Sequence, residues 1–411
     1  MLKKFIVLGI GTLLVSLIGL YNGYPLVYSD TGTYISSGFE KFVPWDRPVT
    51  YGLFLEFFSV RYSAWFIILI QNLLTAFVIY QVIKLFFSDK KYFNLLYYVI
   101  TLFLVVLTSV GWYTNQLMPD FFAPLFMLSF FILIMGKKVS LHSQIILSII
   151  LLLSLLTHFS HIFIGTLLAI LTIALKLGFK TRLEDLAAKR IIVVSSIVFS
   201  SWFILPAINY GVEKNFIFSK GSHVFLMAHL NDTGILEKFL DENCSREAFD
   251  GNKLCHYKDS LPTDLASFIW SGQILEKTGG WENSAEDYNQ IIYSTLKQPE
   301  YLLLNLYRSF TYGMIQLTRI DIGEGLTAYN EGSAPYGQIH WRFHDELNNY
   351  LNSRQNKWGG ANLNFETLNV FHTLLIVLCL FIIILIFSSS LRLVLESRAL
   401  IFLIFIIIAI T

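Results

Sequence analysis

Four titratable side chains stand beside long apolar runs. Asp30 lies in SDTGT, Asp120 in MPD, and His158 and His161 in HFSH. A carboxylate or imidazole at such a place can act as a general acid or base, and ionisable groups close to hydrocarbon are costly and usually functional. Each also has a structural interpretation, since Asp30 and Asp120 suit helix starts and a lone histidine often only fills a turn. Because the histidines are three residues apart, they would share a helix face. We predict that all four side chains, the two aspartates and the two histidines, are catalytic.

Two other kinds of chemistry are less well supported. The triplet at Asp30 also occurs in aspartic proteases, which need two such carboxylates on matching loops. A second D-T-G is present at 232–234, but it lies in a polar region and not beside an apolar run as Asp30 does. The chain has no H-E-x-x-H sequence and no close Cys/His quartet, which disfavours a zinc site. Asp30 and Asp120 could still hold Mg²⁺ or Mn²⁺ with the help of a substrate phosphate.

Basic side chains supply the candidates for substrate binding. Lys220, Arg308 and Arg319 lie in a long polar region and are suited to gripping a phosphate or pyrophosphate; a solvated surface is the alternative for each. Arg47 and Tyr34 lie close to Asp30 in sequence. We expect Arg47 to pair with a nearby carboxylate and so to fix the loop that carries Asp30.

The composition predicts a membrane protein. Of 411 residues, 55% are hydrophobic and only 14% are charged, whereas soluble domains have about 25% charged residues. Apolar runs close to the length of a bilayer-crossing helix recur along the chain, and we expect about nine, the last short enough that the chain could end inside it. They cover residues 5–22, 63–86, 93–110, 120–135, 143–157, 160–176, 190–208, 369–388 and 399–411.

Lysine and arginine clusters fall at alternate ends of these runs, which places the N-terminus in the cytoplasm. The first run has no clear cleavage site and is read as an uncleaved helix. We therefore expect an all-α polytopic protein of the bacterial plasma (inner) membrane. It would comprise a transmembrane module (1–208) with a first outer loop (21–62), a helical and loop-rich extracytoplasmic domain (209–368), and C-terminal helices (369–411).

The cysteines agree with this topology. Cys244 and Cys255 are close together in a polar segment, and such a pair forms a disulfide in an oxidising compartment. Two free thiols are the alternative. Cys379 lies in an apolar run, where we expect a buried free thiol.

The arrangement resembles the GT-C superfamily of integral membrane glycosyltransferases. In that family the first outer loop carries an aspartate just after the first helix, interfacial helices precede the second, and another acidic residue lies in the next outer loop. Asp30 in YSDTGTY, the segment YGLFLEFFSVRY (51–62) and Asp120 in LMPDFF occupy these places. Neither Asp30 nor Asp120 is part of a D-D, D-E or D-x-D doublet, and the chain has no W-W-D-x-G sequence, which disfavours the oligosaccharyltransferase branch and the doublet-bearing mannosyltransferases. The chain also resembles a group of bacterial membrane proteins that share phrases such as M-P-D and H-x-S-H, a similarity that implies no particular activity.

The GT-C resemblance implies transfer of a sugar from a polyprenyl-phosphate or polyprenyl-pyrophosphate donor on the outer membrane face, with Asp30 activating or orienting the acceptor. A transporter or flippase for a lipid-linked or small polar substrate is an alternative, although no internal repeat is visible. A third interpretation is a non-enzymatic envelope assembly protein. A decisive feature would be whether Asp30, Asp120 and the histidines meet in one cavity.

Overall fold

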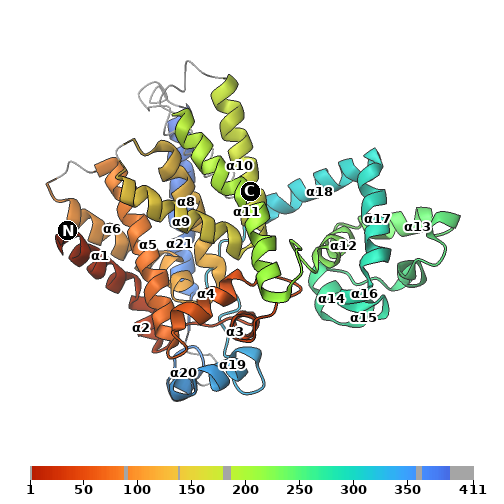
Figure 1. Ribbon diagram of the computed structural model, residues 1–411, viewed down its shortest axis with the longest axis horizontal. Coiled ribbons are helices and arrows are strands. Elements are labelled where there is room, and N and C mark those ends of the chain that lie inside the picture. Colours follow the sequence, from red (N-terminus) through yellow and green to blue (C-terminus); the bar gives the residue numbers. More distant parts are fainter. Residues whose placement is uncertain (1, 88–90, 138, 179–186, 358–362, 389–411) are drawn as a thin grey trace. The chain divides into compact units, whose positions relative to one another are not determined.

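The computed structural model describes residues 2–87, 91–137, 139–178, 187–357 and 363–388 (Figure 1). All regular elements in these ranges are helices, and the β-type pairing found there is an isolated bridge between Leu26 and Gln116. The expected all-α class is therefore confirmed. The chain forms two compact units: residues 219–319 make one, and the described residues before and after them make the other.

The first unit begins with a dense series of helices, broken only by short turns. In order they are α1 (Leu2–Val15), α2 (Leu17–Asn22), α3 (Thr31–Glu40), α4 (Thr50–Ser59), α5 (Ala64–Phe87), α6 (Phe93–Leu107), α7 (Val110–Thr114), the 3₁₀ helix η1 (Pro119–Phe121), α8 (Phe122–Met135), α9 (Leu141–Thr157), α10 (Phe159–Gly178) and α11 (Ala188–Glu213). The later part of the chain adds α19 (Ala334–Arg342), η4 (His344–Glu346), α20 (Leu347–Leu351) and α21 (Glu366–Ser388).

Three helices are long and apolar enough to cross a membrane, by length and composition: α5, α10 and α11. Shorter apolar helices cover Phe93–Leu107, Pro119–Met135, Leu141–Thr157 and Glu366–Ile382. Many of their large apolar side chains are exposed, for example along α10 and α21, as expected for surfaces that face lipid. The expected ninth run, 399–411, lies outside the described residues.

The first apolar run differs from its expected single helix. It divides at Ser16 into α1 and the short α2. Ser16 Oγ donates to the carbonyl of Thr12 at 2.8 Å, a bond of the kind that bends helices. Close packing also limits this region, since a Cβ at Gly19 would lie 2.6 Å from Oδ1 of Asn115.

Residues 320–357 pack onto the beginning of the chain. The Glu346 carboxylate accepts hydrogen bonds from the Tyr24 hydroxyl at 2.8 Å and from the backbone N–H of Ala64 at 3.2 Å, at the start of α5. Gln355 pairs with both backbone groups of Val27, at 3.0 and 2.7 Å. The expected extracytoplasmic region 209–368 is thus divided, because its last part belongs to the first unit.

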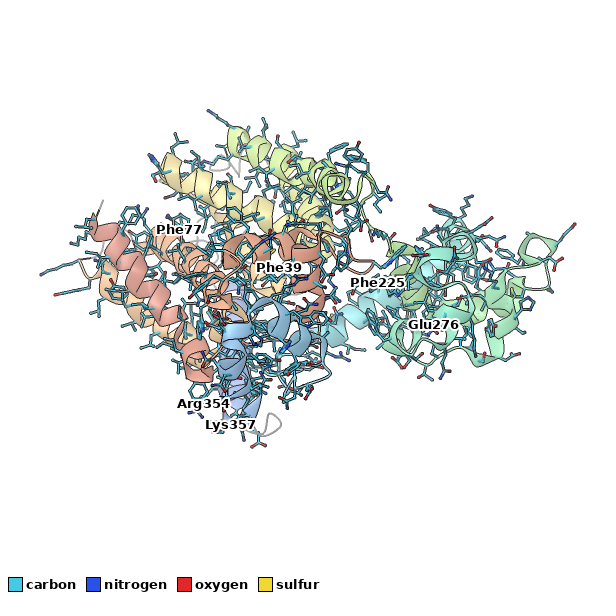
Figure 2. All side chains as sticks on the ribbon, turned by 60° about the horizontal axis from the view of Figure 1, so that its bottom comes forward. Phe39, Phe77, Phe225, Glu276, Arg354 and Lys357 are labelled. Atoms are coloured by element: carbon cyan, nitrogen blue, oxygen red, sulfur yellow. A yellow bond between two sulfur atoms is a disulfide. The ribbon has the colours of Figure 1, made fainter. Side chains whose placement is uncertain are left out.

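The end of this segment packs against the end of α2. Arg354 and Lys357 lie near the end of the ribbon that follows α20 (Figure 2), and Arg354 Nε donates to the carbonyl of Tyr21 at 3.0 Å. The guanidinium of Arg354 also stacks over the Tyr21 ring, with 4.3 Å between its central carbon and the ring centroid. The segment 21–62, the expected first outer loop, is therefore held between the apolar helices and a segment about 300 residues later.

The second unit is built from short helices around its own core. They are α12 (Ser222–Asp232), α13 (Ile235–Asn243), η2 (Glu247–Phe249), η3 (Lys253–Ser260), α14 (Leu265–Trp270), α15 (Gln273–Lys277), α16 (Gly280–Asn283), α17 (Ala285–Lys297) and α18 (Pro299–Gln316). Phe239, Phe268 and Tyr288 are fully buried in this core. The expectation of short helices and loops in this region is confirmed.

Candidate functional site

Asp30 stands at the start of α3 without capping it. It occupies the N-cap position, but its side chain accepts no hydrogen bond from the helix. Its Oδ2 instead lies 3.0 Å from Nη1 of Arg47, and the Asp30 side chain remains 40% exposed. The Nη1 group is not aligned for a hydrogen bond, so the contact is an ion pair. The interpretation of Asp30 as a helix cap does not describe this geometry.

Arg47 is buried and organises the loop around it. Its Nε donates to Oδ2 of Asp46 at 2.9 Å, and Nη2 contacts the same oxygen. The guanidinium lies over the ring of Tyr34, 4.8 Å from the centroid. Burial disfavours its charge, but the hydrogen bonds to Asp46 outweigh that effect, with help from Tyr34 and Asp30, and hold the pKa of Arg47 above its ordinary value. Tyr34 itself is buried, and this burial raises its pKa.

Backbone hydrogen bonds join the loop of Asp30 to the loop of Asp120. The N–H of Leu26 donates to the carbonyl of Asn115 at 2.9 Å, and that of Leu117 donates to Leu26 at 2.8 Å. At the start of α3, Thr31 Oγ1 donates to the carbonyl of Leu117 at 3.1 Å. Two loops that are distant in sequence therefore carry their carboxylates on one framework.

A buried glutamine of α5 supports this framework from the apolar side. Gln71 Nε2 donates to the carbonyls of Thr114 and Gln116 at 2.9 and 3.0 Å. Its Oε1 accepts from the hydroxyl of Tyr51, on α4, at 2.8 Å. Because every polar group of the amide is satisfied, the network rigidifies the loop instead of destabilising the helix.

Asp120 is the second residue of η1 and follows Pro119. Its side chain is exposed at the surface of a cavity. It lies close enough to His158 for its negative charge to favour the imidazolium. Burial opposes that effect, and the pKa of His158 is lowered overall.

The two histidines have different surroundings. The Nδ1 of His158 accepts from the backbone N–H of Ser160 at 3.3 Å, which leaves the proton of the neutral ring on Nε2. His161 is buried and its Nδ1 donates to the carbonyl of Ser154 at 2.7 Å, while its ring stacks on Phe126. The ring centroids of the two histidines are 5.1 Å apart. Protein surrounds the ring of His158, although the residue keeps an exposed surface, and His161 lies behind it in the core.

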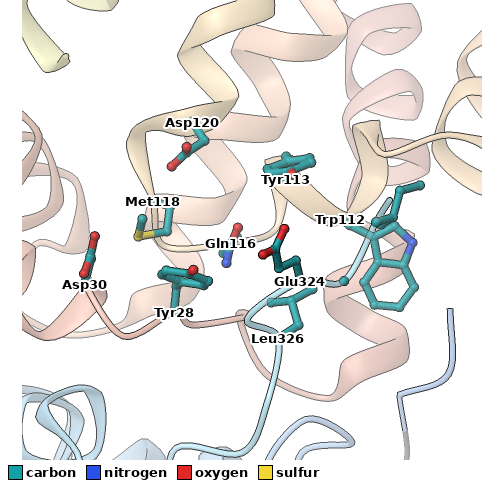
Figure 3. A pocket seen from close by; sticks show the side chains of 11 residues that line it. Tyr28, Asp30, Trp112, Tyr113, Gln116, Met118, Asp120, Glu324 and Leu326 are labelled. Atoms are coloured by element: carbon teal, nitrogen blue, oxygen red, sulfur yellow. The ribbon is translucent and has the colours of Figure 1, made fainter. Parts of the chain in front are cut away.

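Asp30 and Asp120 line one cavity of about 260 Å³ (Figure 3). A third carboxylate, Glu324, lines it as well, and in Figure 3 the three acidic side chains surround Tyr28. The other lining residues are Trp112, Tyr113, Gln116, Met118, Ile322, Gly323 and Leu326. Neither His158 nor His161 is among the described residues that line it.

Glu324 was not identified from the sequence. It lies between Gly323 and Gly325, whose φ values of +97° and +71° favour glycine. A Cβ at Gly325 would lie 1.9 Å from the ring of Tyr28, and one at Gly323 would lie 2.2 Å from Phe365. The G-E-G sequence was the available signal, because it marks a tight loop, but nothing in it indicates that the loop reaches Asp30.

Among the described residues, no three Asp, Glu, His or Cys side chains converge closely enough to hold a metal ion. The expected Mg²⁺ or Mn²⁺ site at Asp30 and Asp120 would thus need further ligands from a substrate, and it stays a prediction.

The three basic residues proposed to bind phosphate belong to the second unit or its boundary. Arg308 is exposed on α18, Arg319 is exposed shortly after it, and Lys220 is half-buried before α12. None of them is among the residues lining the cavity of the first unit. Their role stays a prediction.

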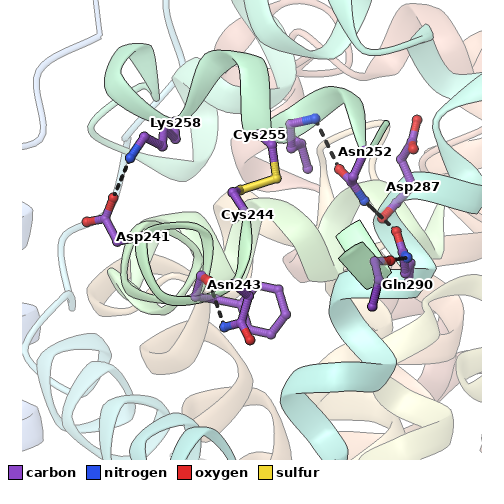
Figure 4. The surroundings of a disulfide bond; sticks show 11 residues. Asp241, Asn243, Cys244, Asn252, Cys255, Lys258, Asp287 and Gln290 are labelled. Atoms are coloured by element: carbon purple, nitrogen blue, oxygen red, sulfur yellow. Dashed lines mark hydrogen bonds and ion pairs between the residues drawn. A yellow bond between two sulfur atoms is a disulfide. The ribbon is translucent and has the colours of Figure 1, made fainter. Parts of the chain in front are cut away.

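Cys244 and Cys255 form a disulfide, with 2.03 Å between the sulfur atoms (Figure 4). The adjacent Asn252 donates to the carbonyl of Asp287 at 3.1 Å and ties the bridged segment to α17. Cys379 is free, as expected, but it is exposed on α21. The expectation of a buried thiol was wrong because that side of α21 has no described protein neighbour over it.

No family model, curated protein or solved structure matches the chain. Its function must therefore be argued from the site itself.

Proposed function

We propose that this chain is an integral membrane glycosyltransferase of the GT-C type. It transfers a sugar from a polyprenyl-phosphate-linked donor to an envelope glycan, lipid or protein acceptor on the extracytoplasmic face of the bacterial inner membrane. About nine helices cross the membrane in this proposal, with the N-terminus in the cytoplasm. The observation that supports it best is that Asp30 and Asp120, from separate loops beside apolar helices, line one cavity.

Asp30 is the proposed base. The acceptor hydroxyl or amide attacks the anomeric carbon of the donor, its proton passes to Asp30, and the bond to the phosphate oxygen breaks with its electron pair. Such a base needs an accessible carboxylate held in one orientation. Asp30 is 40% exposed and is held by Arg47, which is itself fixed by Asp46. Asp120 lines the same cavity and would orient the acceptor.

The aromatic and polar residues that line this cavity suit a sugar. Tyr28, Trp112 and Tyr113 line it, together with the amide of Gln116. Ligand sites commonly combine aromatic walls with a few placed polar groups. Carboxylates accept hydrogen bonds from sugar hydroxyls, and amides both accept and donate them. The departing phosphate needs cationic help, for which Lys220, Arg308 and Arg319 remain the proposed residues.

The test measures donor consumption by the full-length protein in nanodiscs. Radiolabelled polyprenyl-phosphate sugars are supplied with a delipidated envelope extract as the acceptor, and transferred sugar is counted. Asp30→Asn preserves the shape of the side chain and removes its basicity, so we expect the rate to fall by about 10²–10⁴-fold. Expression should stay normal, because no helix cap is lost.

Glu56→Gln is the matched control. Glu56 is another ion-paired carboxylate close to the same loop, bound by Lys41 at 2.7 Å, but it does not line the cavity. Its variant should transfer sugar at close to the wild-type rate. Near-normal transfer by Asp30→Asn would contradict the role of Asp30. A wild-type protein that moves the donor across the bilayer without consuming it would instead indicate a flippase.

A further inference from the structure

A second cavity, of about 640 Å³, lies where the start of α1 meets α5 and the residues leading into α6. Three lysines line it: Lys3 and Lys4 from α1, and Lys91 from the turn before α6. No acidic side chain is among the described residues that line it. The cavity is thus separate from the candidate catalytic site in its position and in the sign of its charge.

A fourth lysine strengthens the positive field. Lys84, in the last turn of α5, is close enough to Lys4 to act on it electrostatically. Within the described part of the chain, the ion pairs found do not include Lys3, Lys4 or Lys91. Like charges held together repel each other, and a bound anion relieves that repulsion.

Apart from Asn94, the rest of the wall is aromatic and apolar. The ammonium of Lys4 lies 5.7 Å from the ring centroid of Tyr80 and 5.8 Å from that of Phe77, which Figure 2 labels. The ammonium of Lys91 lies 5.5 Å from the ring centroid of Tyr92. Tyrosines and lysines gather where membrane helices meet the polar headgroups. A free anion needs only the lysines, whereas a lipid would also use the apolar wall.

We propose that this cavity binds the phosphate headgroup of an anionic glycerophospholipid. The lysines take the phosphodiester, and side chains such as Val7 and Leu95, which also line the cavity, contact the first part of an acyl chain. Basic pockets between membrane helices are known to hold such headgroups. This inference does not depend on the proposed glycosyltransferase activity.

The test measures lipid retention by the purified full-length protein with native mass spectrometry. Phosphatidylglycerol and phosphatidylcholine are titrated separately, and inorganic phosphate is added as a competitor. We expect clear preference for phosphatidylglycerol and no displacement by millimolar phosphate. In the double variant Lys4→Gln/Lys91→Gln, affinity for phosphatidylglycerol should fall by about 30-fold, which corresponds to two charges at about 1 kcal/mol each.

Two further variants separate recognition from folding. Lys189→Gln removes an exposed basic residue of α11 that does not line the cavity, and it should retain the lipid preference. Lys4→Arg/Lys91→Arg keeps both charges and should also retain it. Equal binding of the two lipids, an unchanged preference in the Gln double variant, or displacement by inorganic phosphate would each overturn the proposal. Loss of preference in the Arg double variant would overturn it too, because charge would then not be the cause.

Discussion

The guanidinium of Arg47 gives its two carboxylate partners unequal roles. Asp46 receives its directed hydrogen bond, and its side chain is 13% exposed. Asp30 receives an ion pair alone and is 40% exposed. Removing one partner of a buried charge pair leaves the other uncompensated, so Asp46 is needed to keep Arg47 in place. Asp30 can give up part of its interaction with Arg47 when a ligand binds to its carboxylate.

His158 should make stability depend on pH. Its folded pKa is lowered, first by burial, and Arg47 contributes in the same direction. As the pH falls below about 6.5, the ordinary pKa of histidine, the unfolded chain takes up a proton before the folded protein does. The unfolded state then binds more protons, and stability declines with falling pH until the lowered pKa is passed.

Thermal unfolding in detergent between pH 8 and pH 5 tests this expectation. The wild type should lose more stability than His158→Gln over that interval, because glutamine does not titrate there. Equal losses in the two proteins would show that His158 is protonated to the same extent before and after unfolding.

At the scale of single residues, the sequence identified candidate site residues better than it identified which residues lie next to them in space. Asp30 and Asp120 could be selected because each flanks an apolar run, and the structure places both in one cavity. The pairing of Arg47 with a nearby carboxylate was also predictable from its proximity in the chain. Glu324 was not, because its distance from Asp30 depends on the path of a loop almost 300 residues later.

At the scale of elements, the contact between α3 and α4 depends on glycine. A Cβ at Gly38 would lie 1.9 Å from the backbone oxygen of Gly52. The two helices therefore touch through their backbones, and neither contact atom can rotate away. This close approach fixes the α3–α4 pair, which carries Asp30 at the start of α3 and Arg47 in the connection between the two helices.

Gly38→Ala should lower the free energy of unfolding by roughly 1–3 kcal/mol, the usual range for overpacking. Gly337→Ala is the control, since Gly337 is also helical but has open space where a Cβ would be placed. Alanine is favoured over glycine in a helix by about 0.5–1 kcal/mol, so this variant should be neutral or stabilised. A stable Gly38→Ala protein would mean that α3 and α4 can separate at little cost.

The loop of Glu324 permits a second comparison. Gly325→Ala and Gly332→Ala both place alanine at a positive φ, +71° and +91°, but only the first would meet the ring of Tyr28. The strain of the backbone should thus be similar, and the additional loss in Gly325→Ala should be about 1–3 kcal/mol. Chemical denaturation of the two variants measures the difference. Equal stabilities would show that Tyr28 moves aside freely.

Helices were the most predictable elements. The apolar runs 63–86, 160–176 and 190–208 correspond to α5, α10 and α11, because a long run of one character fixes both the type and the extent of a helix. The break at Ser16 was missed, since it arises from one side-chain hydrogen bond inside an otherwise apolar run. The return of residues 320–357 was missed because it depends on single polar contacts, such as Glu346 with Tyr24, whose partners no local pattern can identify.

At the scale of the whole molecule, the oxidation state of the cysteines indicates the compartment in which the second unit folds. Cys244 and Cys255 are bonded and Cys379 is free. Alkylation of the protein denatured without reductant should therefore add one label, on Cys379, and three labels after reduction. Peptide mapping by mass spectrometry assigns them. Three labels before reduction would mean that the second unit does not mature in an oxidising compartment, against the proposed topology.

Apart from the hydroxyl of Thr31, the bridge between the loops of Asp30 and Asp120 consists of main-chain groups, and this has an evolutionary consequence. Leu26 and Leu117 supply N–H groups, and Leu26 and Asn115 supply carbonyls, which almost every residue type also provides. Side chains on the two loops can therefore diverge to suit different ligands while the carboxylates keep their relative placement. Proline is the exception, because it lacks the N–H that positions 26 and 117 must donate. Relatives of this chain that bind other ligands should vary widely at both positions and yet avoid proline there.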